Sequence, residues 1–284
     1  MSTRSVIQVR GLRKSYDGLE AVRGVDLDAH EGEIVAVLGP NGAGKTTILE
    51  ILEGHRRRDS GEVRVLGFDP ERSPRRLRER IGIVPQETAV EPVLTVREAV
   101  ELYAAAYPHP RPAGEVLALL GLEEQGEQRV SALSGGRQRR LDLAIGIAGD
   151  PELVFLDEPA TGFDPSARRR SWELIRRLRS LGKTILLTTH YMEEAQRLAD
   201  RVVVIAAGRV VADSTPARLS ASGPALIRYR LGGEQISVET DSPQDELLRL
   251  LLWADRHDIR LGGLTVTEPS LEDVYLDLTR AEEA

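Results

Sequence analysis

The chain has 284 residues, which is long enough for one large α/β domain with a small appendage or for two modest domains, and its composition, 41% hydrophobic and 29% charged, is typical of a globular protein. It contains no cysteine, which excludes disulfides, thiol catalysis and cysteine-ligated zinc, and its net charge of −7 argues against a broad nucleic-acid-binding surface. Its longest apolar runs are far shorter than the roughly 20 residues that cross a bilayer, and its start does not resemble a secretory signal.

The first part of the chain combines strand signals with a glycine-rich loop. Short segments at residues 6–9 and 25–27 predict strands, and Asp17-Gly18 predicts a turn between them. Residues 33–38 form an apolar, β-rich run, which is typical of a buried strand. A glycine-rich loop follows this run directly, and the next segment predicts a helix at residues 46–53.

The middle of the chain, residues 92–149, has apolar residues at helical spacing. Pro108 and Pro110 separate two such stretches, so we expect a helical insertion here. Short apolar runs return after it, and they predict strands at residues 153–156, 184–188 and 202–205, with helices at about 166–180 and 192–199. Strands that alternate with helices predict a parallel sheet covered on both faces.

The composition changes again near the C-terminus. Small residues and proline at 220–224 are typical of a linker. The segments after it predict strands at 225–231, 235–240 and 263–267 and helices at 245–257 and 271–279. We therefore expect two domains, residues 1–219 and a small α+β domain at 220–284, with the helical insertion at about 87–150 inside the first.

Residues 39–46 match the phosphate-binding pattern G-x-x-x-x-G-K-[ST] at every fixed position. Glycines let backbone N–H groups form an anion-binding nest, and the following helix adds its dipole. Lys45 would reach the β/γ-phosphates, and the Thr46 hydroxyl would ligate Mg²⁺. A chance glycine turn is the alternative, but the position between a buried strand and a helix favours a nucleotide site. We expect nucleotide contacts from Gly39, Pro40, Asn41, Gly42, Ala43, Gly44, Lys45, Thr46 and Thr47.

Asp157 and Glu158 directly follow the apolar run at residues 153–156. Ligands of open α/β folds bind at the carboxyl edge of the sheet, where such residues lie. We therefore expect Asp157 to hold Mg²⁺, through water, and Glu158 to polarise the water that attacks the γ-phosphate. An acid that caps a turn before Pro159 is the alternative, and the nearby phosphate loop favours the catalytic interpretation.

Two further polar residues follow predicted strands. His190 follows the apolar segment at 184–189, and Gln86 follows the segment at 81–84, so both are expected at the same edge of the sheet. A lone histidine is most often structural, but this position favours a contact between His190 and the γ-phosphate. Gln86 is expected to reach Mg²⁺ or the attacking water.

The segment Leu133-Ser134-Gly135-Gly136-Arg137-Gln138 resembles the signature of the ATP-binding-cassette (ABC) ATPases, in a variant with a basic residue before the glutamine. Alone, this segment could be a serine-capped helix start with two glycines. However, the phosphate loop, the signature, the acidic pair and the histidine follow one another in the order typical of the family. The chain is therefore similar to an ABC ATPase over residues 7 to about 211.

The resemblance implies an α/β fold with a RecA-like P-loop NTPase core, an antiparallel β edge at the N-terminus and a helical subdomain that bears the signature. It implies that Tyr16 stacks on adenine and that Gln86 lies in the loop that joins the core to the helical subdomain and senses the transporter. Thr161-Gly162-Phe163-Asp164-Pro165 resembles the loop at the family's dimer interface, so Asp164 is expected near the nucleotide. The family usually has leucine in place of Phe163, which we interpret as a packing variation.

The resemblance also implies a dimer. In the family, the signature of one cassette closes on ATP held by the other, so Ser134, Gly135 and Gly136 are expected to contact the partner's nucleotide. ATP would then join two cassettes, and its hydrolysis would separate them. The expected cofactors are ATP and Mg²⁺, and the expected partner is a second copy of the chain.

The tail Glu268-Pro269-Ser270-Leu271-Glu272-Asp273-Val274-Tyr275-Leu276 resembles that of cassettes that drive drug-resistance and antibiotic-export permeases of the ABC-2 type, as in daunorubicin resistance. Leu94-Thr95-Val96-Arg97-Glu98 is similar to their helical subdomain, while a capped amphipathic helix is the alternative interpretation of the tail. The resemblance implies an ATPase that powers export of a drug, antibiotic or lipid-like compound through a separate permease. It would then be cytoplasmic, at the inner face of the cell membrane.

Two other functions fit a single cassette. One is a soluble ABC ATPase that acts on a macromolecular machine such as the ribosome or on nucleic acid. Such relatives usually have two cassettes or a long coiled-coil insertion, which this chain lacks, and its acidic charge also disfavours that function. The other is a module that binds ATP without hydrolysis, which the presence of Glu158 and His190 disfavours.

Overall fold

The computed structural model describes residues 4–86, 90–221, 223–267 and 271–276. The chain divides into two compact units, Met1–Asp213 and Ser214–Ala284. This division falls within β9 (Arg209–Ser214), a strand that the sequence pattern did not predict, and it precedes the expected boundary at residues 219 and 220. The two units are described separately below.

The first unit contains a six-stranded sheet with the strand order β5-β6-β7-β3-β8-β9. Its first five strands pair in parallel, and they are β5 (Ile81–Val84), β6 (Leu153–Asp157), β7 (Thr184–Thr189), β3 (Ile34–Leu38) and β8 (Arg201–Ala206). Every residue of β3, β6 and β7 is buried, which explains the runs of consecutive apolar residues that each strand contains. The predicted α/β fold with a parallel sheet is confirmed.

A second, antiparallel sheet in this unit has the order β2-β1-β4 and is made by β1 (Ser5–Tyr16), β2 (Leu19–His30) and β4 (Ser60–Val65). The turn between β1 and β2 lies at Asp17-Gly18, as predicted, and both residues have positive φ. Both strands are longer than predicted because shifts in their register interrupt the alternation of apolar and polar residues. The strand β4 was not predicted.

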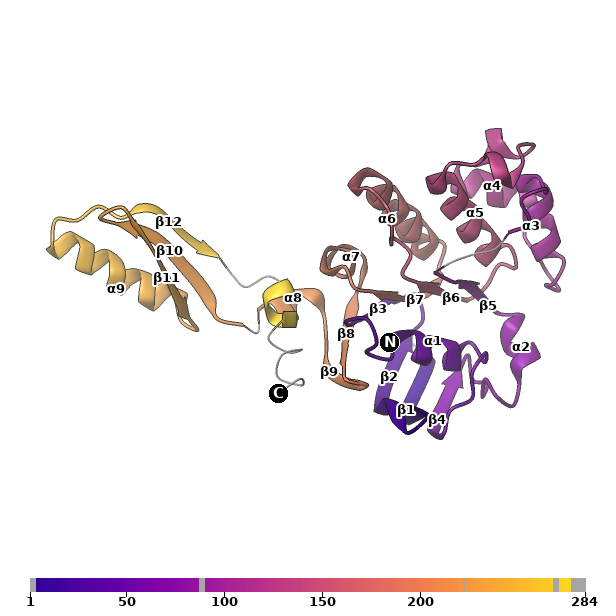
Figure 1. Ribbon diagram of the computed structural model, residues 1–284, viewed down its shortest axis with the longest axis horizontal. Helices are drawn as coiled ribbons and strands as arrows, with labels where there is room; N and C mark the ends of the chain where they lie inside the picture. Colours follow the sequence, from indigo (N-terminus) through magenta and orange to yellow (C-terminus); the bar gives the residue numbers. More distant parts are fainter. Residues whose placement is uncertain (1–3, 87–89, 222, 268–270, 277–284) are drawn as a thin grey trace. The chain divides into compact units, whose positions relative to one another are not determined.

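Helices cover both faces of the parallel sheet. Figure 1 shows α6 (Pro165–Ser180) and α7 (Met192–Leu198) on one face and α1 (Lys45–Leu52), together with the antiparallel sheet, on the other. A short helix, α2 (Pro74–Arg78), precedes β5 and was not predicted. This arrangement directs the carboxyl ends of β5, β6, β7 and β3 toward one edge of the sheet.

The predicted helical insertion comprises α3 (Val96–Ala104), α4 (Ala113–Leu120) and α5 (Gly135–Ile147), with two short 3₁₀ turns at Glu123–Gln125 and Val130–Ala132. Figure 1 shows the three helices grouped beside β5. The backbones of α5 and β5 approach so closely that a Cβ atom at Gly82 would overlap the carbonyl oxygen of Gly146. The helix that begins at the signature is therefore packed directly on the strand that ends just before Gln86.

The second unit contains an antiparallel sheet with the order β11-β10-β12, made by β10 (Ala225–Leu231), β11 (Glu234–Thr240) and β12 (Gly262–Thr267). It also contains α8 (Pro216–Ser220) and α9 (Pro243–Arg256), and α9 packs on β10. Residues 271–276 are helical, as predicted. Residues 268–270 of the tail motif, and residues 277–279 of the predicted last helix, lie outside the described residues.

None of the helices in the described parts of the chain combines the length and the apolar character that crossing a bilayer would require.

Candidate functional site

The phosphate loop connects the end of β3 to the start of α1. Gly44 has φ 101°, and a Cβ atom there would lie 2.5 Å from the carbonyl oxygen of Ala21, so only glycine fits. The Lys45 ammonium folds back over the loop and donates to the carbonyl oxygens of Gly39, at 2.8 Å, and Pro40, at 3.0 Å. Burial lowers the pKa of Lys45, and the nearby charges of Glu158 and Asp157 oppose this shift.

A cavity of about 490 Å³ opens beside this loop. Segments far apart in the sequence contribute to it: the end of β1, the phosphate loop, and the residues that follow β5, β6 and β7. Its lining residues are Tyr16, Ala21, Asn41, Gly42, Gly44, Lys45, Thr46, Thr47, Gln86, Glu158, Thr161 and His190. The structure therefore brings together most of the side chains predicted to bind or hydrolyse a nucleotide.

The two acidic residues at the end of β6 have different surroundings. Asp157 is 9% exposed, and one of its carboxylate oxygens accepts a hydrogen bond from the Thr188 hydroxyl. Glu158 turns sharply, with φ 46°, and its N–H lies 3.1 Å from both the carbonyl and the hydroxyl oxygen of Thr188. Glu158 lines the cavity and Asp157 does not, so the strained turn separates the two carboxylates.

The Glu158 carboxylate has two polar neighbours in the cavity. Its Oε2 atom accepts a hydrogen bond of 2.9 Å from the Thr161 hydroxyl and lies 3.2 Å from Nδ1 of His190. Its Oε1 atom lies 3.9 Å from the Lys45 ammonium. A carboxylate so placed can accept a proton from a water molecule bound between it and the phosphate loop.

Tyr16, the last residue of β1, also lines this cavity. Its hydroxyl lies 3.4 Å from the Thr47 hydroxyl, and the cationic groups of Arg56 and Lys14 lie 5.1 Å and 5.5 Å from the centre of its ring. Cations at this distance attract an aromatic ring and help to fix its position. A fixed ring beside the phosphate loop can stack on a nucleotide base.

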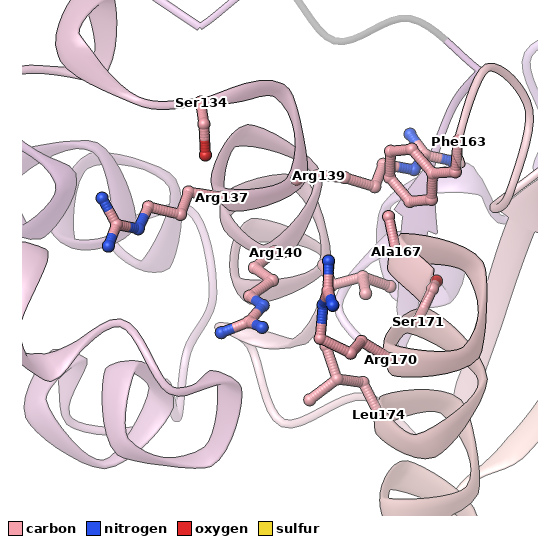
Figure 2. A pocket seen from close by; sticks show the side chains of 11 residues that line it. Ser134, Arg137, Arg139, Arg140, Phe163, Ala167, Arg170, Ser171 and Leu174 are labelled. Atoms are coloured by element: carbon pink, nitrogen blue, oxygen red, sulfur yellow. The ribbon is translucent and has the colours of Figure 1, made fainter. Parts of the chain in front are cut away.

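The signature residues lie at a second cavity, also of about 490 Å³, between α5 and α6 (Figure 2). Ser134 precedes the first turn of α5, and its side chain makes no capping hydrogen bond to that helix. Asp164, by contrast, caps the helix that it precedes, α6. Its carboxylate accepts 2.8 Å hydrogen bonds from the backbone N–H groups of Ala167 and Ser166, and these bonds lower its pKa. None of Ser134, Gly135, Gly136 and Asp164 is among the residues that line the first cavity. One copy of the chain therefore does not bring the signature to its own phosphate loop.

Two features of the site were not predicted from the sequence. The first is the hydrogen bond from Thr161 to Glu158, although Thr161 belongs to a segment that the resemblance identified. The second is the burial of Arg139, which is only 8% exposed although it lies in a run of polar residues on α5. A sequence of basic residues near a helix start is typical of a solvated face, so the pattern gave no signal for it.

A family model described as "ABC transporter" matches residues 22–161, and a model for a C-terminal domain of ABC transporter-like proteins matches residues 207–270. The daunorubicin/doxorubicin resistance ATP-binding protein of Streptomyces peucetius is 36% identical, over 96% of this chain and 92% of the relative. The Nod factor export ATP-binding protein I of Rhizobium sp. (strain N33) is 38% identical, over 99% of both chains. A daunorubicin resistance ATP-binding protein of Streptomyces coeruleorubidus is 41% identical, over 97% and 96%.

Solved structures of ABC transporter cassettes superpose on this chain. An ATP-binding subunit of an ABC transporter superposes with a TM-score of 0.72 at 24% identity, over 96% of this chain and 99% of its own. A dimeric bacterial ABC transporter cassette superposes with a TM-score of 0.65 at 27% identity, over 74% of this chain and 98% of its own. A dimeric post-hydrolysis cassette bound to ADP and phosphate gives the same values.

Proposed function

The chain belongs to the ABC transporter family, as an ATP-binding and ATP-hydrolysing subunit of an exporter, and from this premise we propose how its residues bind and hydrolyse ATP and which permease it drives. The observation that most strongly supports the proposal is the first cavity, where Lys45, Glu158 and His190 meet beside the phosphate loop. Relatives named as resistance and export ATP-binding proteins align over nearly the whole chain, and this supports a membrane permease as the partner.

The phosphates of ATP lie in the loop formed by residues 39–46, with adenine stacked on Tyr16. Lys45 exchanges its two loop carbonyls for oxygens of the β- and γ-phosphates, because an anion binds a buried ammonium more strongly than neutral carbonyls do. Backbone N–H groups at the start of α1 and the hydroxyls of Thr46 and Thr47 complete the site. These proposed contacts are the ones that the sequence predicts for the phosphate loop.

Mg²⁺ is bound together with ATP. No cluster of three or more histidine or acidic side chains that could hold a metal ion occurs in the described parts of the chain. The oxygens of Thr46, Gln86 and Asp157 are hard ligands of the kind that Mg²⁺ prefers, and phosphate oxygens supply further ligands. Asp157 would act through water, and the Thr188 hydroxyl fixes the orientation of its carboxylate. Mg²⁺ held by these residues would neutralise charge that develops on the phosphates.

Glu158 accepts the proton of the attacking water, and His190 orients the γ-phosphate and the Glu158 carboxylate. The short distance between His190 Nδ1 and Glu158 Oε2 supports this pairing, and the Thr161 hydroxyl fixes the same oxygen. Two groups that converge on one carboxylate oxygen restrict the orientation of that carboxylate before the reaction begins, which lowers the entropic part of the barrier.

Two copies of the chain complete each site. The start of α5 offers the N–H groups of Gly135 and Gly136 and the Ser134 hydroxyl, which is not used for capping, to the γ-phosphate of ATP on the partner. Asp164 lies near the same junction. Two ATP molecules are then enclosed between two copies, in agreement with the dimeric cassettes that this chain resembles.

The permease is a separate membrane protein of the ABC-2 type, and the chain binds it at the inner face of the cell membrane. The exported compound is a drug, an antibiotic or a lipid-like molecule, since the relatives are named for daunorubicin and doxorubicin resistance and for Nod factor export. The permease, which forms the path across the membrane, selects this compound.

Co-expression of the chain with the membrane protein encoded beside it tests this proposal. We expect the two to purify as a complex with ATPase activity, and the same complex with Glu158→Gln to bind ATP but to hydrolyse it at least about 100-fold more slowly. Glu193→Gln, on the exposed side of α7, is the matched control and should keep normal activity. Failure to form a complex would contradict the permease assignment, and equal activity of the Glu158→Gln complex would contradict the role of Glu158.

A further inference from the structure

Arg139 lies on α5, the helix that begins at the signature, and its guanidinium group is buried at the junction with the sheet. Its Nε atom donates to the carbonyl oxygen of Pro159 and its Nη2 atom to that of Asp157, both at 3.2 Å. These two carbonyls belong to the residues on either side of Glu158. One side chain from the signature helix therefore holds the backbone on both sides of the proposed catalytic base.

The same guanidinium also reaches the segment that contains Gln86. Its Nη1 atom donates to the carbonyl oxygen of Pro85 at 2.8 Å, and the carbonyl oxygen of Gln86 lies 3.5 Å away. Because the guanidinium is planar and its N–H groups have fixed directions, these contacts fix the relative positions of three backbone segments. The segments are the start of α5, the turn after β6 and the end of β5.

The cost of burying this charge indicates that the contacts have a specific use. Burial lowers the pKa of Arg139, and the carboxylate of Asp142, whose Oδ2 lies 3.6 Å from Nη1, opposes this shift more than Glu194 and Asp157 do. Apolar packing would join α5 to the sheet at a lower desolvation cost. A neutral side chain, however, could not hold several carbonyls at once around the left-handed turn at Glu158.

Arg139 is distinct from the other arginines near the signature. Figure 2 shows that it extends from α5 toward Phe163, whereas Arg137 extends away from α6. Arg139 lines the second cavity and is not among the residues that line the first cavity, beside the phosphate loop. It therefore acts on the proposed catalytic groups through the backbone and does not act by contact with its own copy's ATP.

We infer that Arg139 is a positioning residue that couples the position of the signature helix to Glu158 and Gln86. The inference rests on the proposed roles of those two residues and deepens them. When ATP of a second copy contacts Ser134, any shift of α5 is transmitted by Arg139 to the backbone on both sides of Glu158. The carboxylate then reaches its productive position only when the partner's ATP is present.

The test compares Arg139→Gln, Arg139→Lys and a matched control in the purified full-length chain. Arg177→Gln is the control, because Arg177 also joins the helical insertion to the core, through a 3.3 Å hydrogen bond from Nη1 to the carbonyl oxygen of Leu119, but is exposed. We expect Arg139→Gln to lower kcat by about 10- to 100-fold, since small displacements of a catalytic group have effects of this size, with KM for ATP within about threefold. The kcat of Arg139→Lys should lie between those of the natural chain and Arg139→Gln, because an ammonium group keeps the charge but cannot hold all these carbonyls. Arg177→Gln should not change kcat.

A second measurement separates positioning from a loss of folded protein. Single-turnover hydrolysis is compared for Arg139→Gln in the normal background and in the Glu158→Gln background. If Arg139 acts through Glu158, its replacement has little further effect once the carboxylate is gone, so the two effects are not additive. A normal kcat for Arg139→Gln, or an equal fold-loss in both backgrounds, would overturn the inference. Full activity of Glu158→Gln alone would instead overturn the proposed role of Glu158. If Arg139→Gln does not fold, Arg139→Lys is compared in the same way.

Discussion

Individual buried charges determine much of the chemistry of this cassette. Lys45, Arg139 and Glu194 are each less than a tenth exposed, and each has a different set of partners. Lys45 is held by loop carbonyls that ATP can replace, and Arg139 is held by carbonyls around Glu158. Glu194 lies on α7, and its Oε1 atom accepts a 3.0 Å hydrogen bond from Nε1 of Trp172.

Glu194 leads to a prediction about pH. Burial raises its pKa from 4.5 to about 7, so between these values the folded chain keeps a proton that the unfolded chain has lost. The contribution of Glu194 to stability is therefore fully present below about pH 4.5 and declines as the pH rises to about 7, by on the order of 1–3 kcal/mol. We expect Glu194→Gln, which keeps the acceptor for Trp172 but cannot ionise, to remove this decline.

Denaturant unfolding between pH 5 and pH 8 measures this effect as the difference in free energy of unfolding between the natural chain and Glu194→Gln. As the pH rises across this range, the free energy of unfolding of Glu194→Gln should increase relative to that of the natural chain. Glu193→Gln is the control, because Glu193 is half exposed and pairs with Arg197 on the surface, and its difference should stay flat. Parallel curves for the natural chain and Glu194→Gln would contradict the prediction.

Among the elements, the contact between α5 and β5 joins the helical insertion to the sheet, and it depends on two glycines. A Cβ atom at Gly82 would overlap the carbonyl oxygen of Gly146 and lie 2.9 Å from Cγ of Pro151. We expect Gly82→Ala to destabilise the chain by about 1–3 kcal/mol, as overpacking does, and to lower its Tm. Gly114→Ala in α4 is the control, because a Cβ atom there meets nothing within 4 Å, and it should be neutral or stabilising. Equal Tm values for Gly82→Ala and the natural chain would show that the helix is not packed this closely.

Elements with a clear apolar pattern could be predicted from the sequence, whether they are buried or partly exposed. The buried strands β3, β6 and β7 each contain a run of consecutive apolar residues, and the exposed helix α9 has apolar residues at helical spacing. The strand β4 and the helix α2 were missed because both are short and mostly polar, so neither shows a clear periodicity.

The same distinction applies to the site. Strand ends predicted that Gln86, Glu158 and His190 lie together, because the carboxyl ends of neighbouring parallel strands meet at one edge of a sheet. The contacts of Arg139 with the carbonyls around Glu158 could not be predicted, because they depend on how α5 packs and not on any local pattern.

At the scale of the whole molecule, the central feature of the proposed function is that each ATP site is divided between two copies of the chain. The phosphate loop, Glu158 and His190 share one cavity, whereas Ser134 and Gly136 line another. A nucleotide bound by one copy alone would lack the signature. If the signature contacts ATP as proposed, ATP joins two copies and its hydrolysis releases them.

Sedimentation velocity of the Glu158→Gln chain tests this requirement most directly, because the variant should bind ATP without consuming it. With ATP and Mg²⁺ we predict a species of twice the 31.3 kDa mass of the chain, and a monomer with ADP or without nucleotide. A chain that also carries Ser134→Arg should bind ATP and stay monomeric, since the Ser134 side chain does not cap α5 and its loss leaves the helix intact. A Glu158→Gln chain that stays monomeric at saturating ATP, or a double variant that dimerises equally well, would contradict a site shared between two copies.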